Sequence, residues 1–209
     1  MGYHRAGFDV VGVDIEPQPH YPFEFVQDDA LKFLNRMIGE PLDFDAVHAS
    51  PPCQHYSVST AEPGRHPDLY AQVRDLLEAT GLPWVIENVI GSPYESGVVL
   101  CGGMFGMEIR RHRNFESSFM VMAPPHTCPR EPWQVTGHLH RTKQVSKRHR
   151  KPDRETALAV MDCPWMDHEE VVLAIPPAYT EFVGMQLRYY LDHAERTRIP
   201  TDEVQQGGV

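Results

Sequence analysis

The sequence lacks any apolar run that approaches the roughly 18 residues needed to cross a bilayer, and its first residues contain no signal-peptide core. It also contains no internal repeat, no C-x-x-C pair, and only four widely separated cysteines: Cys53, Cys101, Cys128 and Cys163. These absences argue against a membrane protein, a zinc ribbon and a disulfide scaffold. We therefore expect a soluble protein of a reducing, intracellular compartment.

The spacing of the histidines and cysteines also gives little support for a metal site. His126 and Cys128, together with Cys163 and nearby histidines, could be grouped as metal ligands, but their spacing is irregular. We therefore expect them in the core or on the surface, and no bound metal. The chain contains no H-x-E followed by P-C-x-x-C, which disfavours a zinc deaminase.

Basic residues are outnumbered: 19 Lys and Arg stand against 29 Asp and Glu, for a formal net charge of −10. A nucleic-acid-binding protein ordinarily carries a basic face. Residues 138–154, however, hold seven basic side chains and one acid, leaving 12 basic and 28 acidic residues for the rest of the chain. Local charge is therefore more informative than the total. The candidate DNA-binding residues of this basic segment are Arg141, Lys143, Lys147, Arg148, Arg150 and Lys151.

Hydrophobic periodicity predicts strands that alternate with helices, the pattern of an α/β fold with a doubly wound, mostly parallel sheet. Strands are expected at about 8–13, 44–48, 82–86, 98–101 and 115–121. Helices are expected to end near Gly7 and to cover about 31–38, 68–80, 153–161 and 177–196. We expect a core at 1–122, a loop-rich segment at 123–152 where periodicity is lost, helices returning to the core at 153–196, and a flexible tail at 197–209.

Cys53 lies where a structural cysteine has little reason to be. The apolar run 44–48 suits a buried strand, and Pro51 and Pro52 then end it abruptly. Ligands of open α/β sheets bind at the carboxyl ends of the strands. A partly exposed thiol held there by a rigid turn is a candidate nucleophile, although a lone cysteine is more often an inert buried one.

A second reactive group follows the next predicted strand. Residues 82–86 lead directly into Glu87, which is expected at the same sheet edge as Cys53. An Arg-His-Arg run, Arg111 to Arg113, precedes the strand at 115–121. Near the start of the chain, Asp14 closes a strand, where an acid often holds a ribose hydroxyl.

These elements, in this order, resemble the DNA (cytosine-5) methyltransferases. The resemblance rests on SPPCQ around Cys53, ENV at Glu87, the R-x-R at Arg111 and Arg113, and AIPPAYTEFVG near the end, and it extends to about Gly184 apart from the recognition segment. It implies a Rossmann-like fold that uses S-adenosylmethionine and methylates C5 of cytosine in double-stranded DNA, after flipping the base out of the duplex.

The resemblance also implies residue roles. Cys53 would be the nucleophile, Glu87 the acid at N3 of the base, and Arg111 and Arg113 the groups that orient it. The residues implied to support the base pocket and its loop are Pro52, Gln54, Asn88 and Val89. Those implied to bind the cofactor are Asp14, Ile15, Asp29, Pro51, Ala174 and Ile175. The interval that holds the basic segment corresponds to the family's target-recognition region.

A compact enzyme of this kind suits the cytoplasm of a bacterium or of a phage-infected host, acting as a monomer, with or without a restriction partner. Two alternatives stay open. One is a DNA-binding relic that has lost catalysis, and the other is an enzyme that modifies C5 of a free pyrimidine nucleotide.

Two departures from the family pattern matter. The family begins with a strand and a Gly-rich F-x-G-x-G loop, and this sequence starts after them, which suggests a chain incomplete at its amino end. Its last motif usually carries an Asn where Leu173 stands here. We therefore expect weak S-adenosylmethionine binding, and either direct pairing of the strands at Asp14 and before Cys53 or a gap between them.

Overall fold

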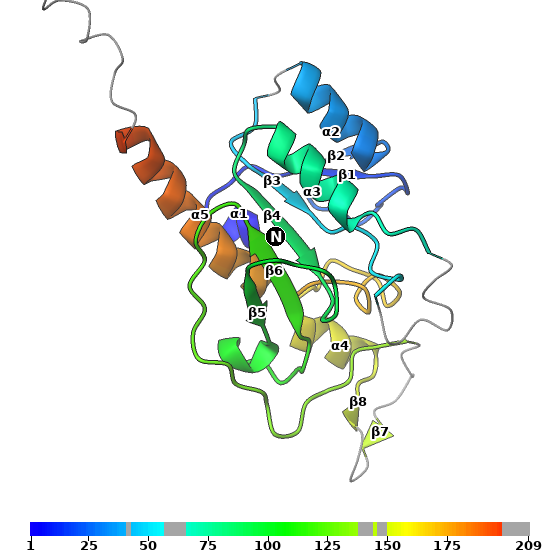
Figure 1. Cartoon of the computed structure of the whole chain (residues 1–209). Coiled ribbons are helices and arrows are strands. Elements are labelled where there is room, and N and C mark those ends of the chain that lie inside the picture. Colours follow the sequence, from blue (N-terminus) through cyan, green and yellow to red (C-terminus); the bar gives the residue numbers. More distant parts are fainter. Residues whose placement is uncertain (41–42, 57–65, 138–143, 146–149, 198–209) are drawn as a thin grey trace, which may run out of the picture.

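The computed structural model describes residues 1–40, 43–56, 66–137, 144–145 and 150–197 (Figure 1). The helices of these ranges are α1 (Gly2–Arg5), α2 (Ala30–Gly39), α3 (Tyr70–Ala79), α4 (Arg154–Met161) and α5 (Pro177–Thr197), with a 3₁₀ turn at Gly102–Phe105. The strands are β1 (Val11–Asp14), β2 (Glu24–Gln27), β3 (Val47–Ala49), β4 (Trp84–Asn88), β5 (Val98–Leu100), β6 (Arg113–Ser117), β7 (Gln144–Val145) and β8 (Arg150–Lys151).

The strands form three sheets. The largest has the order β3-β4-β6-β5, with β3 and β4 parallel and β6 antiparallel to both of its neighbours. β1 and β2 form a separate parallel pair, and β7 and β8 a short antiparallel one. The fold is thus mixed α/β, as expected. A single doubly wound, mostly parallel sheet is not confirmed, because the two parallel pairs belong to different sheets.

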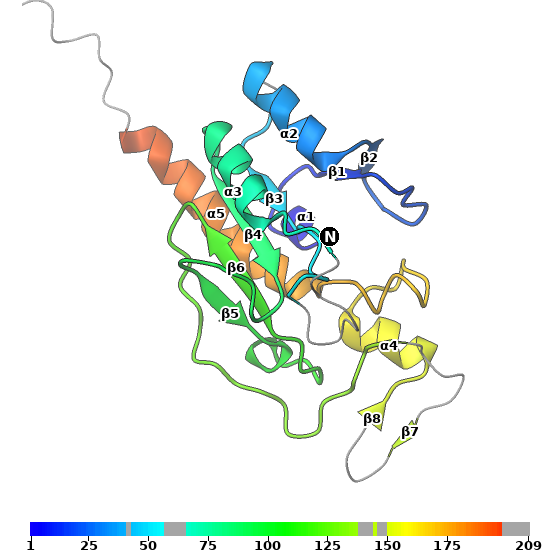
Figure 2. The same cartoon turned by 45° about the vertical axis from the view of Figure 1, so that its right-hand side comes forward.

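β4 is the centre of a three-layer arrangement. Its side chains alternate between two faces, as they must in a strand. Trp84 and Ile86 pack with the buried residues of α2 and α3, whereas Val85 packs with Tyr179, Val183 and Leu187 of α5. Figures 1 and 2 accordingly show α2 and α3 on one side of the sheet and α5 on the other. All five residues of β4 are buried.

Helix α1 is short and lies against α5. A Cβ at Gly2 would collide with Thr180 and with the carbonyl of Pro177, so glycine allows the two backbones to approach. The phenol of Tyr3 then reaches across to the imidazole of His48 on β3, with its oxygen 2.8 Å from Nδ1. The first residues of the chain are therefore part of the layer behind the sheet.

β1 and β3 do not pair with each other, and this decides between the two arrangements expected from the sequence. β1 pairs with β2, and β3 with β4, so a gap separates the two parallel pairs within the described part of the chain. The residues of both strands are only half-buried, unlike those of β4. Packing of α2 on α3, in the cluster that includes Leu34 and Leu77, joins the β1-β2 pair to the larger sheet.

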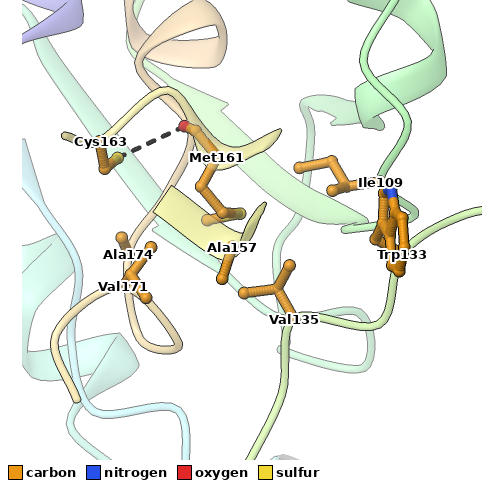
Figure 3. Packing of buried hydrophobic residues seen from close by; sticks show 8 residues of the cluster. All are labelled: Ile109, Trp133, Val135, Ala157, Met161, Cys163, Val171 and Ala174. Carbon is orange, nitrogen blue, oxygen red and sulfur yellow. Dashed lines mark hydrogen bonds between the residues drawn. The ribbon is translucent and has the colours of Figure 1, made fainter. Parts of the chain in front are cut away.

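A further core lies against α4 (Figure 3). It contains Ile109, Trp133, Val135, Ala157, Met161, Cys163, Val171 and Ala174. The predicted loop-rich segment therefore contributes Trp133 and Val135 to a core, where we expected only a surface excursion. This segment leads into α4. The carboxylate of Asp153 caps the first turn of α4 by accepting a hydrogen bond from the backbone N–H of Thr156.

Most predicted elements are present, with ends displaced by a few residues. The missed ones are β2, the 3₁₀ turn, β7 and β8. β7 and β8 have only two residues each, too few to show a period, and β2 has only two apolar residues between the exposed Glu24 and Gln27. Among the described residues, no helix combines the length and apolar character needed to cross a bilayer.

Candidate active site

The loop that carries Cys53 is fixed to the end of β4. Ala49 of β3 lies beside Ile86 of β4 in parallel register, so Cys53 and Glu87 follow neighbouring strands at one edge of the sheet. Asn88 is buried, and its Nδ2 donates a 3.0 Å hydrogen bond to the carbonyl of Pro51. Asn88 therefore holds the two strand ends together.

The Cys53 turn itself is partly exposed. The backbone N–H of Tyr56 donates to the carbonyl of Cys53 at 3.0 Å, which closes the turn after the two prolines. The thiol is half-buried, and Pro52 and Gln54 beside it are exposed. A nucleophile needs this combination of a fixed backbone and an accessible sulfur.

Glu87 is a buried carboxyl group with a cationic neighbour. Only 5% of its surface is exposed, and the Nε of Arg113 lies 2.9 Å from its Oε1. Burial raises the pKa of Glu87 above its usual range, while the charge of Arg113 and a hydrogen bond from Ser50 act in the opposite direction. A carboxyl whose neutral form is favoured can serve as a proton donor near neutral pH.

A chain of polar contacts leads from Glu87 back to α1. Ser50 hydrogen-bonds to Glu87, and its hydroxyl lies 3.1 Å from Nε2 of His48, whose Nδ1 faces the phenol of Tyr3. Burial lowers the pKa of His48 to about 4, so the ring is neutral at physiological pH. Sequence reasoning gave no role to these three residues. Ser50 is the first residue of SPPCQ, whereas His48 and Tyr3 stand in no motif, and only the fold brings them to Glu87.

The two arginines of the R-x-R element have different surroundings. Arg113 forms the ion pair with Glu87, whereas the buried Arg111 donates to the carbonyls of Val135 and Val172, at 3.1 and 2.9 Å. Burial lowers the pKa of Arg111 to about 10, which leaves it charged at neutral pH. Its Nε is buried and has no hydrogen-bond partner among the described residues, so a donor is left over at this place.

The final helix is attached to the same element. Tyr179 of α5 donates a 2.6 Å hydrogen bond to the carbonyl of Arg111, and the tyrosine is fully buried. The carbonyl of Val89 accepts from Asn114, next to Arg113. The loop after β4, the R-x-R element and the start of α5 are thus mutually fixed.

A cleft with a volume of about 290 Å³ opens beside the end of β1. Asp14 and Ala174, both predicted cofactor residues, line it from opposite parts of the chain. Its remaining lining residues are Gln18, His20, Tyr21, Trp165, Met166, Glu170 and Leu173. The carboxylate of Asp14 accepts from the backbone N–H of Glu16 at 2.9 Å, which orients it.

The other predicted cofactor residues are not among those that line this cleft. Asp29 caps α2 by accepting from the backbone N–H groups of Leu31 and Lys32. Ile15 is 63% exposed just after β1, Pro51 is buried behind the Cys53 turn, and Ile175 packs against the core around Phe115. The structure thus brings together two of the predicted cofactor residues, Asp14 and Ala174, at this cleft.

Most of the basic segment lies outside the described residues: this applies to Arg141, Lys143, Lys147 and Arg148. Arg150 is described, and its guanidinium lies over the ring of Trp133 at 4.1 Å and 3.6 Å from a carboxylate oxygen of Glu108. Lys151 is half-buried beside it in β8. Arg150 therefore has a packing role in addition to its charge.

Cys163 lies in the core of Figure 3, apart from His126 and Cys128, which agrees with the expected core or surface placement of these residues. Its Sγ is 3.4 Å from the carbonyl of Met161, and burial raises its pKa to about 12. Cys101 and His112 instead join His126 and Cys128 in one cluster of possible metal ligands. Their separation in sequence concealed this arrangement.

Comparison with known proteins gives matches among the solved structures. No family model and no curated protein matches the chain. One of the solved structures that match is a protein of E. coli described as a DNA modification methyltransferase encoded within a prophage. It is 22% identical with a TM-score of 0.40, and the match covers 55% of this chain and 41% of that one. The chain thus spans less than half the length of this structural neighbour.

Proposed function

We propose that the chain is a DNA (cytosine-5) methyltransferase that transfers a methyl group from S-adenosylmethionine to C5 of a flipped cytosine. The observation that carries the proposal is that the Cys53 turn follows β3 while Glu87 lies near the end of the neighbouring parallel strand β4, and that Asn88 fixes the two strand ends together by its hydrogen bond to Pro51. A thiol nucleophile beside a carboxyl of raised pKa suits covalent catalysis on a ring.

The residues then have distinct tasks. The thiolate of Cys53 adds to C6 of the base, while the carboxyl of Glu87 gives a proton to N3, so that C5 becomes nucleophilic. Once C5 has taken the methyl group, water removes the C5 proton, the electrons of that C–H bond expel Cys53 as a thiolate, and N3 returns its proton to the carboxylate of Glu87, so that the aromatic ring is restored. Arg113 keeps Glu87 in place at 2.9 Å, and Arg111 fixes the backbone of this segment through the carbonyls of Val135 and Val172.

S-adenosylmethionine would supply the electrophilic methyl group. The cleft beside β1 offers residues that fit it: the carboxylate of Asp14 suits ribose hydroxyls, and Trp165 and Tyr21 offer aromatic surfaces to a purine. Ala174, at the opposite wall, leaves space because its side chain is small.

The direct test is to incubate the chain with duplex DNA and a high concentration of the cofactor, digest the DNA, and identify the methylated nucleoside by mass spectrometry. We expect 5-methylcytosine. N4-methylcytosine or N6-methyladenine would contradict the proposal, and methylation of free deoxycytidine monophosphate in place of DNA would favour the nucleotide-modifying alternative. DNA binding without any methylation would favour the relic.

Cofactor binding should depend on Asp14. We expect Asp14→Asn to weaken it by about 10- to 150-fold, because a hydrogen bond to a charged acceptor contributes about 1.5–3 kcal/mol. Ligand-observed NMR suits the measurement, since binding by the wild-type chain is itself expected to be weak. Asp75→Asn, an exposed acid on α3, is the control. Equal affinity of both variants would place the ribose elsewhere.

Binding of duplex DNA should depend on the basic segment. Replacing Arg141, Lys143, Lys147 and Arg148 by Gln should weaken binding and reduce the slope of log K against log salt by about 0.9 for each phosphate that is no longer neutralised. Arg150 is left intact because it packs on Trp133 and pairs with Glu108. A slope that does not change in a salt titration would mean that this segment neutralises no phosphate.

A further inference from the structure

We propose that Cys101, His112, His126 and Cys128 bind a zinc ion in a tetrahedral Cys₂His₂ site. Cys101 directly follows β5, His112 directly precedes β6, and His126 and Cys128 lie on the segment that leads away from the sheet toward Trp133. Each residue offers one ligand atom, and the four atoms lie within 4.8 Å of one another.

Four of the six separations are close to those around a tetrahedral zinc ion, and the other two, from the sulfur of Cys101 to the two imidazoles, are within 4.8 Å. The two sulfurs are 3.7 Å apart, the two Nε2 atoms are 3.0 Å apart, and the sulfur of Cys128 lies 3.4 and 3.8 Å from the Nε2 atoms of His112 and His126. With Zn–S near 2.3 Å and Zn–N near 2.0–2.1 Å, tetrahedral angles place two sulfurs about 3.8 Å, two nitrogens about 3.3 Å, and sulfur and nitrogen about 3.6 Å apart.

Interactions among the four side chains alone explain the convergence of their ligand atoms less well than a bound cation does. A disulfide needs sulfurs about 2.05 Å apart, whereas both cysteines are free. The two imidazoles stack with their planes 22° apart and point Nε2 at Nε2. A proton on one nitrogen satisfies that single contact only. A cation at the centre satisfies all four ligand atoms, and thiolate with imidazole is a ligand set typical of zinc.

The backbone around the site allows the two ligand-bearing segments to approach each other closely. This observation is separate from the distances between the ligand atoms. A Cβ at Gly103 would lie 2.6 Å from the carbonyl oxygen of Thr127 and 2.9 Å from Cα of Cys128, so glycine lets the second ligand segment reach the first. The backbone N–H groups of Gly103 and Arg111 hydrogen-bond to the sulfur of Cys101. Such second-shell donors orient a metal-bound thiolate.

The role of this ion would be structural, because four protein ligands leave no open coordination position for a substrate. It would fasten the segment after β6 to the sheet near its exposed edge. His112 stands between Arg111 and Arg113, so the same ion would also fix the backbone of the R-x-R element. The zinc site rests on its own contacts and does not depend on the proposed methyl transfer.

The test is the metal content of the purified full chain, expressed with added zinc and measured by plasma mass spectrometry. We expect about one zinc per chain, and an intense thiolate-to-metal absorption band when cobalt replaces zinc. Cys128→Ser and His126→Ala should each lose the metal. The exposed positions of both residues favour retention of the fold, which circular dichroism checks.

Matched controls are Cys53→Ser and His168→Ala, which remove a thiol and an imidazole elsewhere and should keep the metal. Should either ligand variant fail to fold, chelation of the wild-type chain replaces it: removal of zinc should lower Tm, and added zinc should restore it. Wild-type chain without zinc, a Cys101–Cys128 disulfide in its place, or unchanged zinc in folded Cys128→Ser would each overturn the proposal.

Discussion

Cys53→Ser should abolish methyl transfer while leaving duplex DNA binding unchanged. A serine hydroxyl is far less nucleophilic than a thiolate at neutral pH, and loss of the nucleophile from a covalent enzyme lowers kcat on the order of 10⁴-fold or more. The substitution is nearly isosteric and lies in a half-buried turn, so the fold should persist. Transfer of a radiolabelled methyl group to DNA measures the loss, and a gel-shift assay measures binding.

Cys163→Ala is the matched control for this prediction. Its thiol is buried, and burial raises its pKa to about 12, so it is protonated at neutral pH and unreactive. We expect the folded variant to retain methyl transfer. Substantial activity of Cys53→Ser, or a loss in Cys163→Ala equal to that in Cys53→Ser, would mean that the nucleophile has been assigned wrongly.

Glu87→Gln should lower kcat by about 10²- to 10⁴-fold, the contribution typical of a general acid. Glutamine can still donate a hydrogen bond to N3 of the base, but it cannot transfer a proton. In the wild-type chain, activity should decline as pH rises through the raised pKa of Glu87, because only the protonated carboxyl is the acid. The variant should lack this decline in a pH–rate profile.

The pH dependence of the free energy of unfolding gives an independent test of the raised pKa of Glu87. A carboxyl whose pKa is higher in the folded than in the unfolded state stabilises the fold below the unfolded value of 4.5, and this contribution is lost as pH rises through the folded pKa. The free energy of unfolding of Glu87→Gln, relative to wild type, should therefore increase with pH above about 4.5. A difference that stays constant with pH would contradict the raised pKa.

Glu116→Gln is the control for burial and charge. Glu116 is also a buried carboxyl, on β6, but it accepts a 2.7 Å hydrogen bond from Tyr70 and faces Arg74, both on α3. Its replacement should affect stability and leave kcat of the folded protein largely intact. An equal fall of kcat in both variants would show that losing any buried charge is sufficient.

The sequence predicted the placement of those candidate residues that stand at or near strand ends. Cys53, Glu87 and Asn88 each follow an apolar run that was long enough to recognise, and the parallel register of β3 and β4 brings the runs together. The division of roles between Arg111 and Arg113 was not predictable. It depends on which guanidinium faces Glu87 and which reaches Val135 and Val172, and that is a property of packing.

Contacts between segments that lie far apart in the chain could not be predicted from the sequence either. The path from Glu87 through Ser50 and His48 to Tyr3 needs α1 to lie behind β3, which local periodicity does not encode. The pairing of strands was likewise open, because a period of two residues identifies a strand without naming its neighbour. The separation of β1 from β3 and the antiparallel β6 are for this reason structural findings.

The central claim is that Cys53 forms a covalent bond with cytosine, and trapping on 5-fluorocytosine tests it most directly. Fluorine at C5 cannot leave as a proton does, so the adduct cannot resolve after methyl transfer. Duplex DNA containing this base is incubated with the chain and a high concentration of S-adenosylmethionine, and the mixture is analysed by denaturing electrophoresis and intact mass. We predict a covalent protein–DNA adduct with wild type and none with Cys53→Ser. Absence of the adduct with wild type, or its formation by Cys53→Ser, would contradict the claim.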